Sequence, residues 1–366
     1  MSKKELRVAL LGTGFMGKAH SNAWCQAGHY YDLPWKLRRT LVCGRGEAAL
    51  NQIAQQWEWE ESSTDWRAAI DRKDIDAVDI CLPNYLHAPA AIAAAEAGKI
   101  ILCEKPLALS ADEARTMVHA ARNVPTLVWF NYRRVPAIAY AHQLIAEGRL
   151  GRIYHYNATY FQQWGADTSR PPSWKMDPAL AGSGVADDLL THALDLSMYL
   201  NGRITEGIAT TRIFAEGRTV DDAISALVNF DNGSLGRFEA SRFGIGCKNR
   251  NAFDIHGSGG MLRFNLEDLN RLEFLDAKDP SPEQGARNLL VTDMKHPIFP
   301  NFWRPGHIIG YEHTFIAALA EFVQCLASGQ DFHPNFADAL LVHEALDALQ
   351  ASAKTRLWTA VKYMGA

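Results

Sequence analysis

Short apolar runs alternate with longer amphipathic segments over the first third of the chain. Apolar side chains in the longer segments follow helical spacing, whereas the short runs are almost wholly apolar. Runs of this kind are typical of strands in a parallel sheet that is covered on both faces. The predicted strands are 6–11, 39–43, 77–82, 100–103 and 126–130, and the predicted helices include 18–27, 47–58, 65–70 and 88–97. This alternation predicts an N-terminal Rossmann domain over residues 1–130.

The pattern changes after residue 130. A predicted helix at 136–147 is followed by segments in which polar and apolar positions alternate, as in half-buried strands: 153–162, 207–214, 222–230, 235–243, 251–256 and 261–264. The Asp231-Asn232-Gly233-Ser234 link predicts a hairpin with a type I′ turn, because Asn-Gly accepts positive φ angles. We therefore expect residues 131–366 to form a second α/β domain with a large, mostly antiparallel, open sheet. An open sheet face must be covered or paired, which predicts a homodimer or homotetramer.

A glycine-rich loop, Gly12-Thr13-Gly14-Phe15-Met16-Gly17, lies between the first predicted strand and the first predicted helix. This G-x-G-x-x-G order fits a dinucleotide site, in which the first glycine makes the tight turn and the second admits a pyrophosphate. The third glycine lets helix and strand pack closely, and the helix N-terminus favours the phosphates. A generic glycine-rich turn is the alternative.

The second predicted strand ends at Gly44-Arg45, where a carboxylate would bind the ribose of NAD. An arginine here tolerates a 2′-phosphate and favours NADP. Alternatively, Arg45 stacks on the adenine and the cofactor is NAD. The sequence leaves both cofactors open.

Polar residues also follow the later predicted strands. Cys103-Glu104-Lys105-Pro106 ends one of them, and strand carboxyl ends in such sheets face the ligand. Either Lys105 acts on a bound molecule, or Glu104 and Lys105 are only a polar strand end. The other candidates for contact with the cofactor are Pro83, Asn84, His87 and Asn131, although Asn84 could instead cap the next helix.

A Gly182-Ser183-Gly184 lead-in precedes a predicted helix that carries Asp188 and His192. Residues four apart lie on one helix face, so the carboxylate and the imidazole could form a proton-handling pair. A structural hydrogen-bonded pair is the alternative interpretation.

Together, the glycine loop, the Glu104-Lys105-Pro106 motif and the Asp188/His192 helix resemble the glucose–fructose oxidoreductase/inositol dehydrogenase/rhizopine catabolism (Gfo/Idh/MocA) oxidoreductases, over almost the whole chain. The resemblance implies a nicotinamide cofactor bound between the domains, and a sugar or polyol substrate bound by residues 131–366. It also implies that Lys105 and His192 are catalytic and that Asp188 binds the substrate. Gly44-Arg45 departs from members that carry an acidic residue there.

A late loop, 295–307, resembles a segment of a subgroup that oxidises pyranoses such as levoglucosan or glucosides, often at C3. Aromatic and basic side chains suit a sugar, because rings stack on its CH face and polar groups bind its hydroxyls. The candidates for this wall are Trp164, Trp174, Lys175, Phe302, Trp303 and His307, with ordinary packing as the alternative for the tryptophans. His307, Glu312 and His313 match no known metal-ligand spacing, so no metal is expected.

These motifs predict NAD(P)-dependent hydride transfer from a sugar or polyol hydroxyl. In this mechanism His192 or Lys105 removes the hydroxyl proton, the charge of Lys105 stabilises the alkoxide, and Asp188 orients a neighbouring hydroxyl. One alternative is a glycosidase that works by transient oxidation, elimination and re-reduction. Another is a nucleotide-sensing regulator without chemistry.

Composition narrows the partners and the compartment. The formal net charge is −4, and no run concentrates Lys and Arg, so nucleic acid and anionic membrane are not expected partners. Apolar segments are too short for a membrane span or a signal peptide. The six cysteines are scattered and never lie in a C-x-x-C spacing, which predicts reduced thiols in a cytoplasmic protein.

Overall fold

The structure is a computed structural model that describes residues 3–169, 171 and 173–364. These residues divide into two compact units, one of residues 3–131 with 310–340, and one of the described residues of 132–309 with 341–364. The sequence analysis had placed everything after residue 130 in the second domain. The observed first unit also includes residues 310–340, because helix α9 (Tyr311–Ser328) packs on α1 (Phe15–Tyr30). The Phe315 and His20 ring centroids are 5.5 Å apart.

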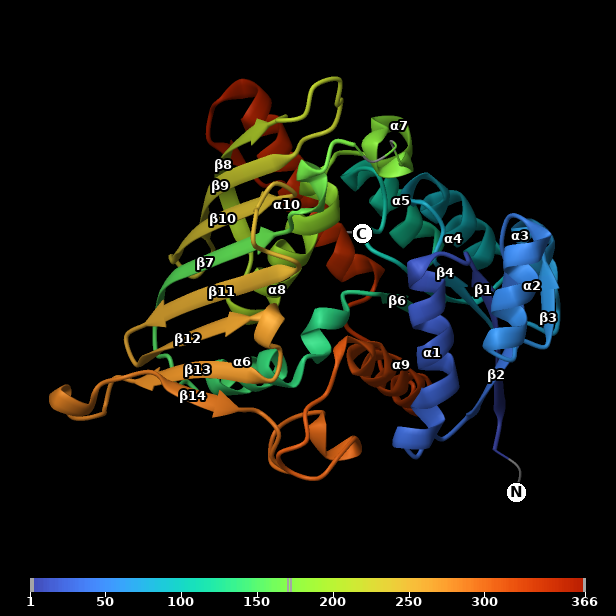
Figure 1. Cartoon of the computed structure of the whole chain (residues 1–366), viewed down its shortest axis with the longest axis horizontal. Helices are drawn as coiled ribbons and strands as arrows, with labels where there is room; N and C mark the ends of the chain where they lie inside the picture. The colour runs from blue at the N-terminus through green and yellow to red at the C-terminus, as the bar shows by residue number, and fades with distance from the viewer. Residues whose placement is uncertain (1–2, 170, 172, 365–366) are drawn as a thin grey trace. The chain divides into compact units, whose positions relative to one another are not determined.

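In the described part of the first unit, six parallel strands form a sheet in the order β3-β2-β1-β4-β5-β6 (Figure 1). This is the strand order of a Rossmann fold, as predicted. The strands are β1 (Glu5–Leu11), β2 (Lys36–Cys43), β3 (Glu61–Ser63), β4 (Ala77–Ile80), β5 (Ile100–Cys103) and β6 (Thr126–Val128). The helices are α1, α2 (Glu47–Gln56), α3 (Trp66–Asp71), α4 (His87–Glu96), α5 (Ala111–Ala120) and α9.

Local sequence explains where these elements begin and end. Every residue of β4 is buried, as expected for a strand covered on both faces. The Asp65 carboxylate caps α3 by accepting from the backbone N–H groups of Arg67 and Ala68, and the Ser110 hydroxyl caps α5 in the same way. Gly98 follows α4 at φ +67°, a conformation that glycine adopts without strain.

The second unit contains a nine-stranded sheet within the described residues, in the order β14-β13-β12-β11-β7-β10-β9-β8-β15. Of its pairings, β7 with β10 is parallel and the others are antiparallel, which confirms the mostly antiparallel prediction. The strands are β7 (Ile153–Phe161), β8 (Ile204–Arg212), β9 (Ala223–Phe230), β10 (Leu235–Ser241), β11 (Arg250–Gly257), β12 (Gly260–Asn265), β13 (Arg271–Asp276), β14 (Arg287–Leu290) and β15 (Thr359–Ala360). The helices are α6 (Pro136–Ala146), α7 (Pro178–Ala181), α8 (Thr191–Leu200) and α10 (Phe336–Thr355), which begins in the first unit.

The hairpin between β9 and β10 forms where it was predicted, but its turn type was wrong. Gly233 has φ +81°, whereas Asn232 does not have the positive φ that a type I′ turn requires. The Gly233 N–H donates to the Phe230 carbonyl, and the Phe230 N–H donates to the Ser234 carbonyl. The link is therefore a three-residue loop that ends in a left-handed glycine. The Asn232 side chain donates to the Asn201 carbonyl, which favours this longer loop.

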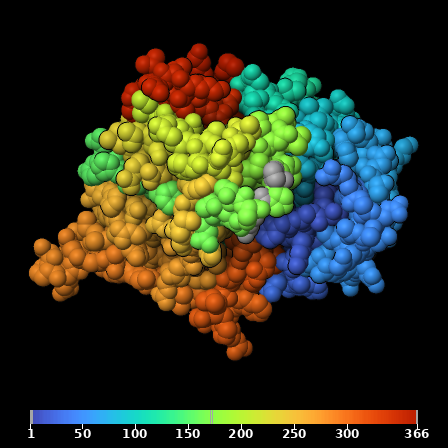
Figure 2. All heavy atoms as spheres, turned by 45° about the horizontal axis from the view of Figure 1, so that its top comes forward, coloured from blue at the N-terminus to red at the C-terminus, as the bar shows by residue number. Residues whose placement is uncertain are grey.

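The inner face of the second sheet carries an aromatic core. Tyr156 of β7 lies against Phe230, Phe238 and Phe253, with ring centroids 5.9 to 6.0 Å apart. The segment between β13 and β14 projects from the sheet edge, coloured orange in Figures 1 and 2. No helix within the described ranges is long and apolar enough to cross a membrane.

A buried ion pair ties α8 to the residues before α6. The Arg133 guanidinium contacts both oxygens of Asp195 at 2.6 to 3.1 Å, and the Asp195 side chain is 1% exposed. Removing one charge of such a pair leaves the other buried and uncompensated, which destabilises a protein strongly.

We predict that Asp195→Asn lowers the free energy of unfolding by about 3–5 kcal/mol. The matched control is Asp254→Asn, which makes the same chemical change in an exposed pair with Arg263. The control should cost less than about 1 kcal/mol. Urea denaturation of the two variants checks this, and equal losses would contradict it.

Candidate active site

The glycine loop forms a tight turn that leads directly into α1. The predicted loop covers the whole motif, with the helix starting at residue 18. In the structure the helix begins at Phe15, so the last three residues of the motif belong to its first turn. Gly12 has φ +116°, and a Cβ there would lie 2.4 Å from the Cys81 carbonyl oxygen. A Cβ on Gly17 would lie 2.2 Å from the Gly12 carbonyl oxygen. Two of the three glycines are therefore required by close backbone contacts.

Gly14 differs from these two glycines because a Cβ built on it would meet no atom within 4 Å. It is the N-cap of α1, where backbone N–H groups and the positive end of the helix dipole attract anions. A free approach to this N-terminus fits a dinucleotide phosphate group. Phe15 is 72% exposed at the same turn, and Thr13 and Met16 are partly exposed.

Thr13 occupies the space that a side chain at position 44, just after β2, would need. A Cβ on Gly44 would lie 2.5 Å from the Thr13 Cγ2 and 2.8 Å from its Oγ1. The carboxylate that binds ribose in other dinucleotide sites therefore has no room at position 44 while Thr13 keeps this conformation. The neighbouring Arg45 is exposed, and the structure records no hydrogen bond from it to any described residue.

Glu104 and Lys105 follow the carboxyl end of β5, as predicted. The Glu104 N–H donates to the Ile80 carbonyl of β4, and its Oε2 accepts from the Lys105 N–H at 3.1 Å. Glu104 is 5% exposed, whereas Lys105 is partly exposed. The Lys105–Pro106 peptide bond is cis. The Glu104 carboxylate thus holds the backbone N–H of the lysine.

His87 lies elsewhere than the sequence analysis expected. Its ring is wholly buried, with Nδ1 2.9 Å from the Pro106 carbonyl oxygen and Nε2 2.8 Å from that of Leu82. Burial lowers the pKa of His87, although both carbonyls oppose that change. The ring therefore links the end of β4 to the loop after Lys105, which is a positioning role and not a surface for contact with nicotinamide.

The remaining cofactor candidates are also placed by the fold. Pro83 is partly exposed and precedes a short 3-10 turn, Asn84–Leu86, which leads into α4. Asn131 is 3% exposed, and its side-chain amide donates to the Thr314 hydroxyl of α9 at 2.7 Å. The Asn131 side chain thereby fastens α9 to the end of β6.

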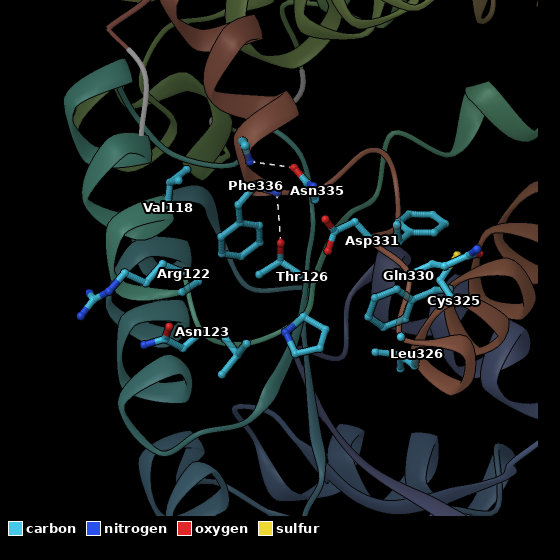
Figure 3. A pocket seen from close by; sticks show the side chains of 17 residues that line it. Val118, Arg122, Asn123, Thr126, Cys325, Leu326, Gln330, Asp331, Asn335 and Phe336 are labelled. Carbon is cyan, nitrogen blue, oxygen red and sulfur yellow. Dashed lines mark hydrogen bonds between the residues drawn. The ribbon is translucent and has the colours of Figure 1, made fainter.

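The first unit has a separate cavity of about 450 Å³. Figure 3 shows the side chains that line it. Its wall comes from the ends of α5 and α9 and the start of α10, and the Phe336 N–H donates to the Thr126 hydroxyl there. Thr126 is the first residue of β6, so the cavity lies at the amino ends of the strands. The glycine loop and Lys105 follow carboxyl ends, at the opposite edge of the sheet. This cavity is therefore not the dinucleotide site.

In the second unit, Asp188 lies in a wide π-helical turn, Ala186–Leu190, that continues into α8. The Asp221 carboxylate holds the start of this turn by accepting from the N–H groups of Gly184 and Ala186 at 2.7 and 2.9 Å. A Cβ on Gly184 would lie 1.9 Å from the Asp221 carbonyl oxygen, so only glycine fits. Gly184 thus lets the backbone of the lead-in approach the backbone of Asp221 closely.

Two cations flank the Asp188 carboxylate. Lys175 Nζ lies 3.3 Å from both of its oxygens, and Arg242 Nη2 lies 3.1 Å from Oδ2. The Arg242 side chain is 1% exposed and lies 4.8 Å from the Trp164 ring centroid, whereas Lys175 is 40% exposed. Arg242 therefore fixes the carboxylate from the interior, and Lys175 contacts it from the solvent side. The sequence analysis proposed Trp164 and Lys175 but missed Arg242.

His192 is buried among tyrosines that the sequence analysis also missed. Its ring centroid lies 4.6 Å from that of Tyr132 and 5.8 Å from that of Tyr160. The two tyrosine hydroxyls are 3.0 Å apart, and Tyr160 donates to Asn249 Oδ1 at 2.8 Å. Two tyrosine rings therefore pack against the imidazole, and their hydroxyls hydrogen-bond to each other.

The other predicted sugar contacts lie on surface segments. Trp174 is partly exposed in a short 3-10 turn, with the Lys175 ammonium 5.9 Å from its ring centroid. Phe302 is buried, whereas Trp303 is 42% exposed and His307 is exposed on the loop before α9. Their part in substrate binding stays a prediction.

Asp187, next to Asp188, should make stability depend on pH. Burial raises its pKa to about 7, although the Ser183 N–H donates to its Oδ2 at 2.5 Å. An unfolded aspartate has a pKa of about 3.9. Between these values the folded state keeps a proton that the unfolded state has lost, so rising pH destabilises the fold until it passes about 7.

We predict that Asp187→Asn, which cannot ionise, removes this pH dependence. We compare the free energy of unfolding of the variant with that of wild type at each pH. The difference, variant minus wild type, should increase by about 1–4 kcal/mol from acid to mildly alkaline pH. Urea denaturation of both proteins across this range measures the difference. A constant difference would show that Asp187 does not titrate in this way.

Family models of known proteins match segments of both units. Residues 6–132 match the model of an oxidoreductase family with an NAD-binding Rossmann fold, and residues 138–263 match the GFO/IDH/MocA C-terminal domain. The chain is 37% identical to levoglucosan dehydrogenase of Pseudarthrobacter phenanthrenivorans, over 99% of this chain and 100% of that protein. It is 28% identical to inositol 2-dehydrogenase of Rhizobium meliloti, over 70% of this chain and 74% of that protein.

Solved structures are similar over the same length. An oxidoreductase domain protein from Kribbella flavida is 41% identical with a TM-score of 0.96, covering 98% of this chain and 100% of that chain. Levoglucosan dehydrogenase in complex with NADH and levoglucosan is 38% identical with a TM-score of 0.95, and the coverage is the same.

Proposed function

Because this chain belongs to the Gfo/Idh/MocA oxidoreductases, we propose that it is an NAD-dependent dehydrogenase that oxidises a ring hydroxyl of a pyranose. The observation that carries the proposal is the Asp188 carboxylate held by Lys175 and Arg242, on the same helical segment as the buried His192. A carboxylate fixed in this way accepts hydrogen bonds from sugar hydroxyls, and the imidazole supplies a base. Similarity to levoglucosan dehydrogenase supports a pyranose as substrate.

The glycine loop is the part of the chain that would hold the dinucleotide. The open approach to Gly14 and the N-terminus of α1 suit its phosphates. NAD, when bound, supplies the hydride acceptor. The chain's own residues bind the two substrates, orient them and handle the proton.

We assign two roles to Lys105 and His192. One of them accepts the proton from the substrate hydroxyl as the carbon is oxidised, and the packing of the His192 imidazole against the Tyr132 and Tyr160 rings favours it as the base. The ammonium of Lys105 stabilises the negative charge that develops on the substrate oxygen. Asp188 orients a neighbouring hydroxyl.

We predict that Lys105→Ala lowers kcat by about 100- to 1,000-fold, because the developing alkoxide loses its counter-charge. NADH binding, followed by fluorescence titration, should persist. The control is Lys73→Ala, which removes an exposed lysine of the same unit and should leave turnover unchanged. Near-normal turnover of the Lys105 variant would exclude this role.

The substrate is tested by supplying the wild-type enzyme with levoglucosan, glucosides and inositols while NADH absorbance is recorded. NADH formation with pyranoses supports the proposal. Release of an aglycone without net NADH would instead indicate cleavage by transient oxidation. Cofactor binding without turnover of any sugar would indicate a regulator.

We propose NAD over NADP, with Arg45 stacking on the adenine. The support is the NAD-binding family model and the exposed position of Arg45 after β2. Arg45→Ala should then weaken NADH binding about two- to fivefold, as expected for loss of an exposed stacking contact. The control is Arg67→Ala, an exposed arginine that stacks on Trp66 of the same unit. Tighter binding of NADPH than of NADH by wild type, abolished in the Arg45 variant, would reverse the choice.

We also propose that the outer face of the second sheet pairs two copies of the chain, giving a homodimer or a homotetramer. Leu227 of β9 and Leu235 of β10 are 50% and 53% exposed on this face. Sedimentation of wild type against Leu227→Arg/Leu235→Arg tests the pairing. A cytoplasmic location is proposed because all six cysteines are free thiols, as in reducing compartments.

A further inference from the structure

A histidine outside the proposed chemistry is buried between two carboxylates. His20 lies on α1, and its ring is wholly buried. Its Nδ1 is 3.1 Å from both oxygens of Asp79 on β4, and its Nε2 is 2.9 Å from Glu104 Oε1 after β5. One imidazole therefore joins a helix to the ends of two neighbouring strands.

The Asp79 carboxylate is itself held in place. Trp24 Nε1 donates to Oδ2 at 2.7 Å, and Trp129 Nε1 donates to Oδ1 at 2.9 Å. The Trp129 ring also lies against the imidazole, with centroids 4.2 Å apart, and the Phe315 ring lies 5.5 Å away. The orientation of His20 is therefore determined by packing as well as by hydrogen bonds.

Three groups face the His20 ring nitrogens: the Asp79 carboxylate, the Glu104 carboxylate and the Cys81 thiol, whose Sγ lies 2.9 Å from Nδ1. A neutral imidazole has one N–H, so it would turn a lone pair toward one of the carboxylates. An imidazolium donates to both. Burial lowers the pKa of His20, but the combined effects of Asp79 and Cys81 outweigh it, so the net pKa is well above the usual value of 6.5.

The other end of this network reaches Lys105. Glu104 Oε1 lies 2.9 Å from His20 Nε2, and Glu104 Oε2 accepts a hydrogen bond from the backbone N–H of Lys105 at 3.1 Å. Without the imidazolium, Glu104 would be a buried carboxylate with one oxygen unpaired, and it would move toward solvent. Movement of Glu104 would release the peptide that carries the lysine.

We propose that His20, as a buried imidazolium held by Asp79, is a positioning residue that fixes Lys105 through Glu104. The proposal rests on the proposed function, in which Lys105 stabilises the charge on the substrate oxygen. His20 touches neither substrate nor cofactor in this account, and its effect on turnover passes through the Glu104 carboxylate.

A metal ion is the competing interpretation of the same cluster. Ligand atoms of His20, Asp79 and Cys81 lie within 4.8 Å of one another. However, the Cys81 Sγ lies 2.9 Å from His20 Nδ1, within hydrogen-bonding distance of the imidazole. Both oxygens of Asp79 already accept indole N–H groups. The hydrogen bonds therefore account for the cluster without an ion.

The first test is His20→Gln, with His29→Gln as the matched control on the exposed side of the same helix. We expect kcat of the His20 variant to fall about 10- to 100-fold, because small displacements of a reacting group cost this much. The KM for the sugar and the Kd for NADH should stay near wild type. Unchanged kcat in an active wild-type background would overturn the proposal.

A double-mutant cycle separates positioning from general damage to the fold. If His20 acts through Glu104, then His20→Gln/Glu104→Gln should lose no more turnover than the worse single variant. Losses that multiply would show independent roles and contradict the proposal. A stoichiometric zinc ion in wild type that is absent from the His20 variant would establish the metal site in its place.

Two measurements need no activity, so they separate this inference from the proposed function. Amide hydrogen exchange of Lys105 should be faster in His20→Gln than in wild type or His29→Gln. If the His20 variant does not fold, ¹⁵N NMR of histidine-labelled wild type decides the matter. One imidazole should keep both N–H protons at mildly alkaline pH, and a singly protonated His20 would overturn the proposal. Failure of wild type to oxidise any sugar, with these two results as expected, would remove the function and leave the network intact.

Discussion

The first unit depends on a carboxylate buried in the middle of a parallel sheet. Asp79 occupies a strand position where neighbouring residues are apolar, and burial of an unpaired charge would cost more than a domain can tolerate. Two indole N–H groups and the His20 imidazolium satisfy it. Because these donors come from α1 and from the residue after β6, the carboxylate determines how the helix that starts at the glycine loop lies on the sheet.

Much of this arrangement could be predicted because its signals are local. Gly12, Gly14 and Gly17 follow one strand at fixed spacing, and Glu104-Lys105-Pro106 ends another. Strand carboxyl ends meet at one edge of a parallel sheet, so these segments were expected at the same edge. Strands β7 to β12 were identified within a few residues from their alternation, whereas β13, β14 and β15 were not predicted. The hairpin turn was misjudged because the Asn232 side chain bonds to a residue 31 positions away.

The features that the sequence did not reveal depend on contacts between distant residues. His20 and Asp79 are 59 positions apart, and Arg242 and Asp188 are 54 apart. Each of these residues has an unremarkable sequence context, since Asp79 reads as part of a strand and Arg242 as a residue at a strand end. Similarly, the amphipathic pattern of α9 shows that one face is buried, but not that the helix returns to the first unit.

Each unit holds one charged candidate residue through neighbouring groups: Lys105 in the first unit and Asp188 in the second. In the first, the Glu104 carboxylate and the His20 imidazolium hold the peptide that carries the Lys105 ammonium. In the second, the buried Arg242 guanidinium and the partly exposed Lys175 ammonium hold the Asp188 carboxylate. The Nε and Nη1 atoms of Arg242 are buried without a hydrogen-bond partner among the described residues, and the ring face of Trp164 lies beside the guanidinium instead. A guanidinium tolerates this because it is weakly hydrated and stacks on aromatic faces, whereas a lysine would not. An arginine at this position therefore gives Asp188 a buried counter-ion.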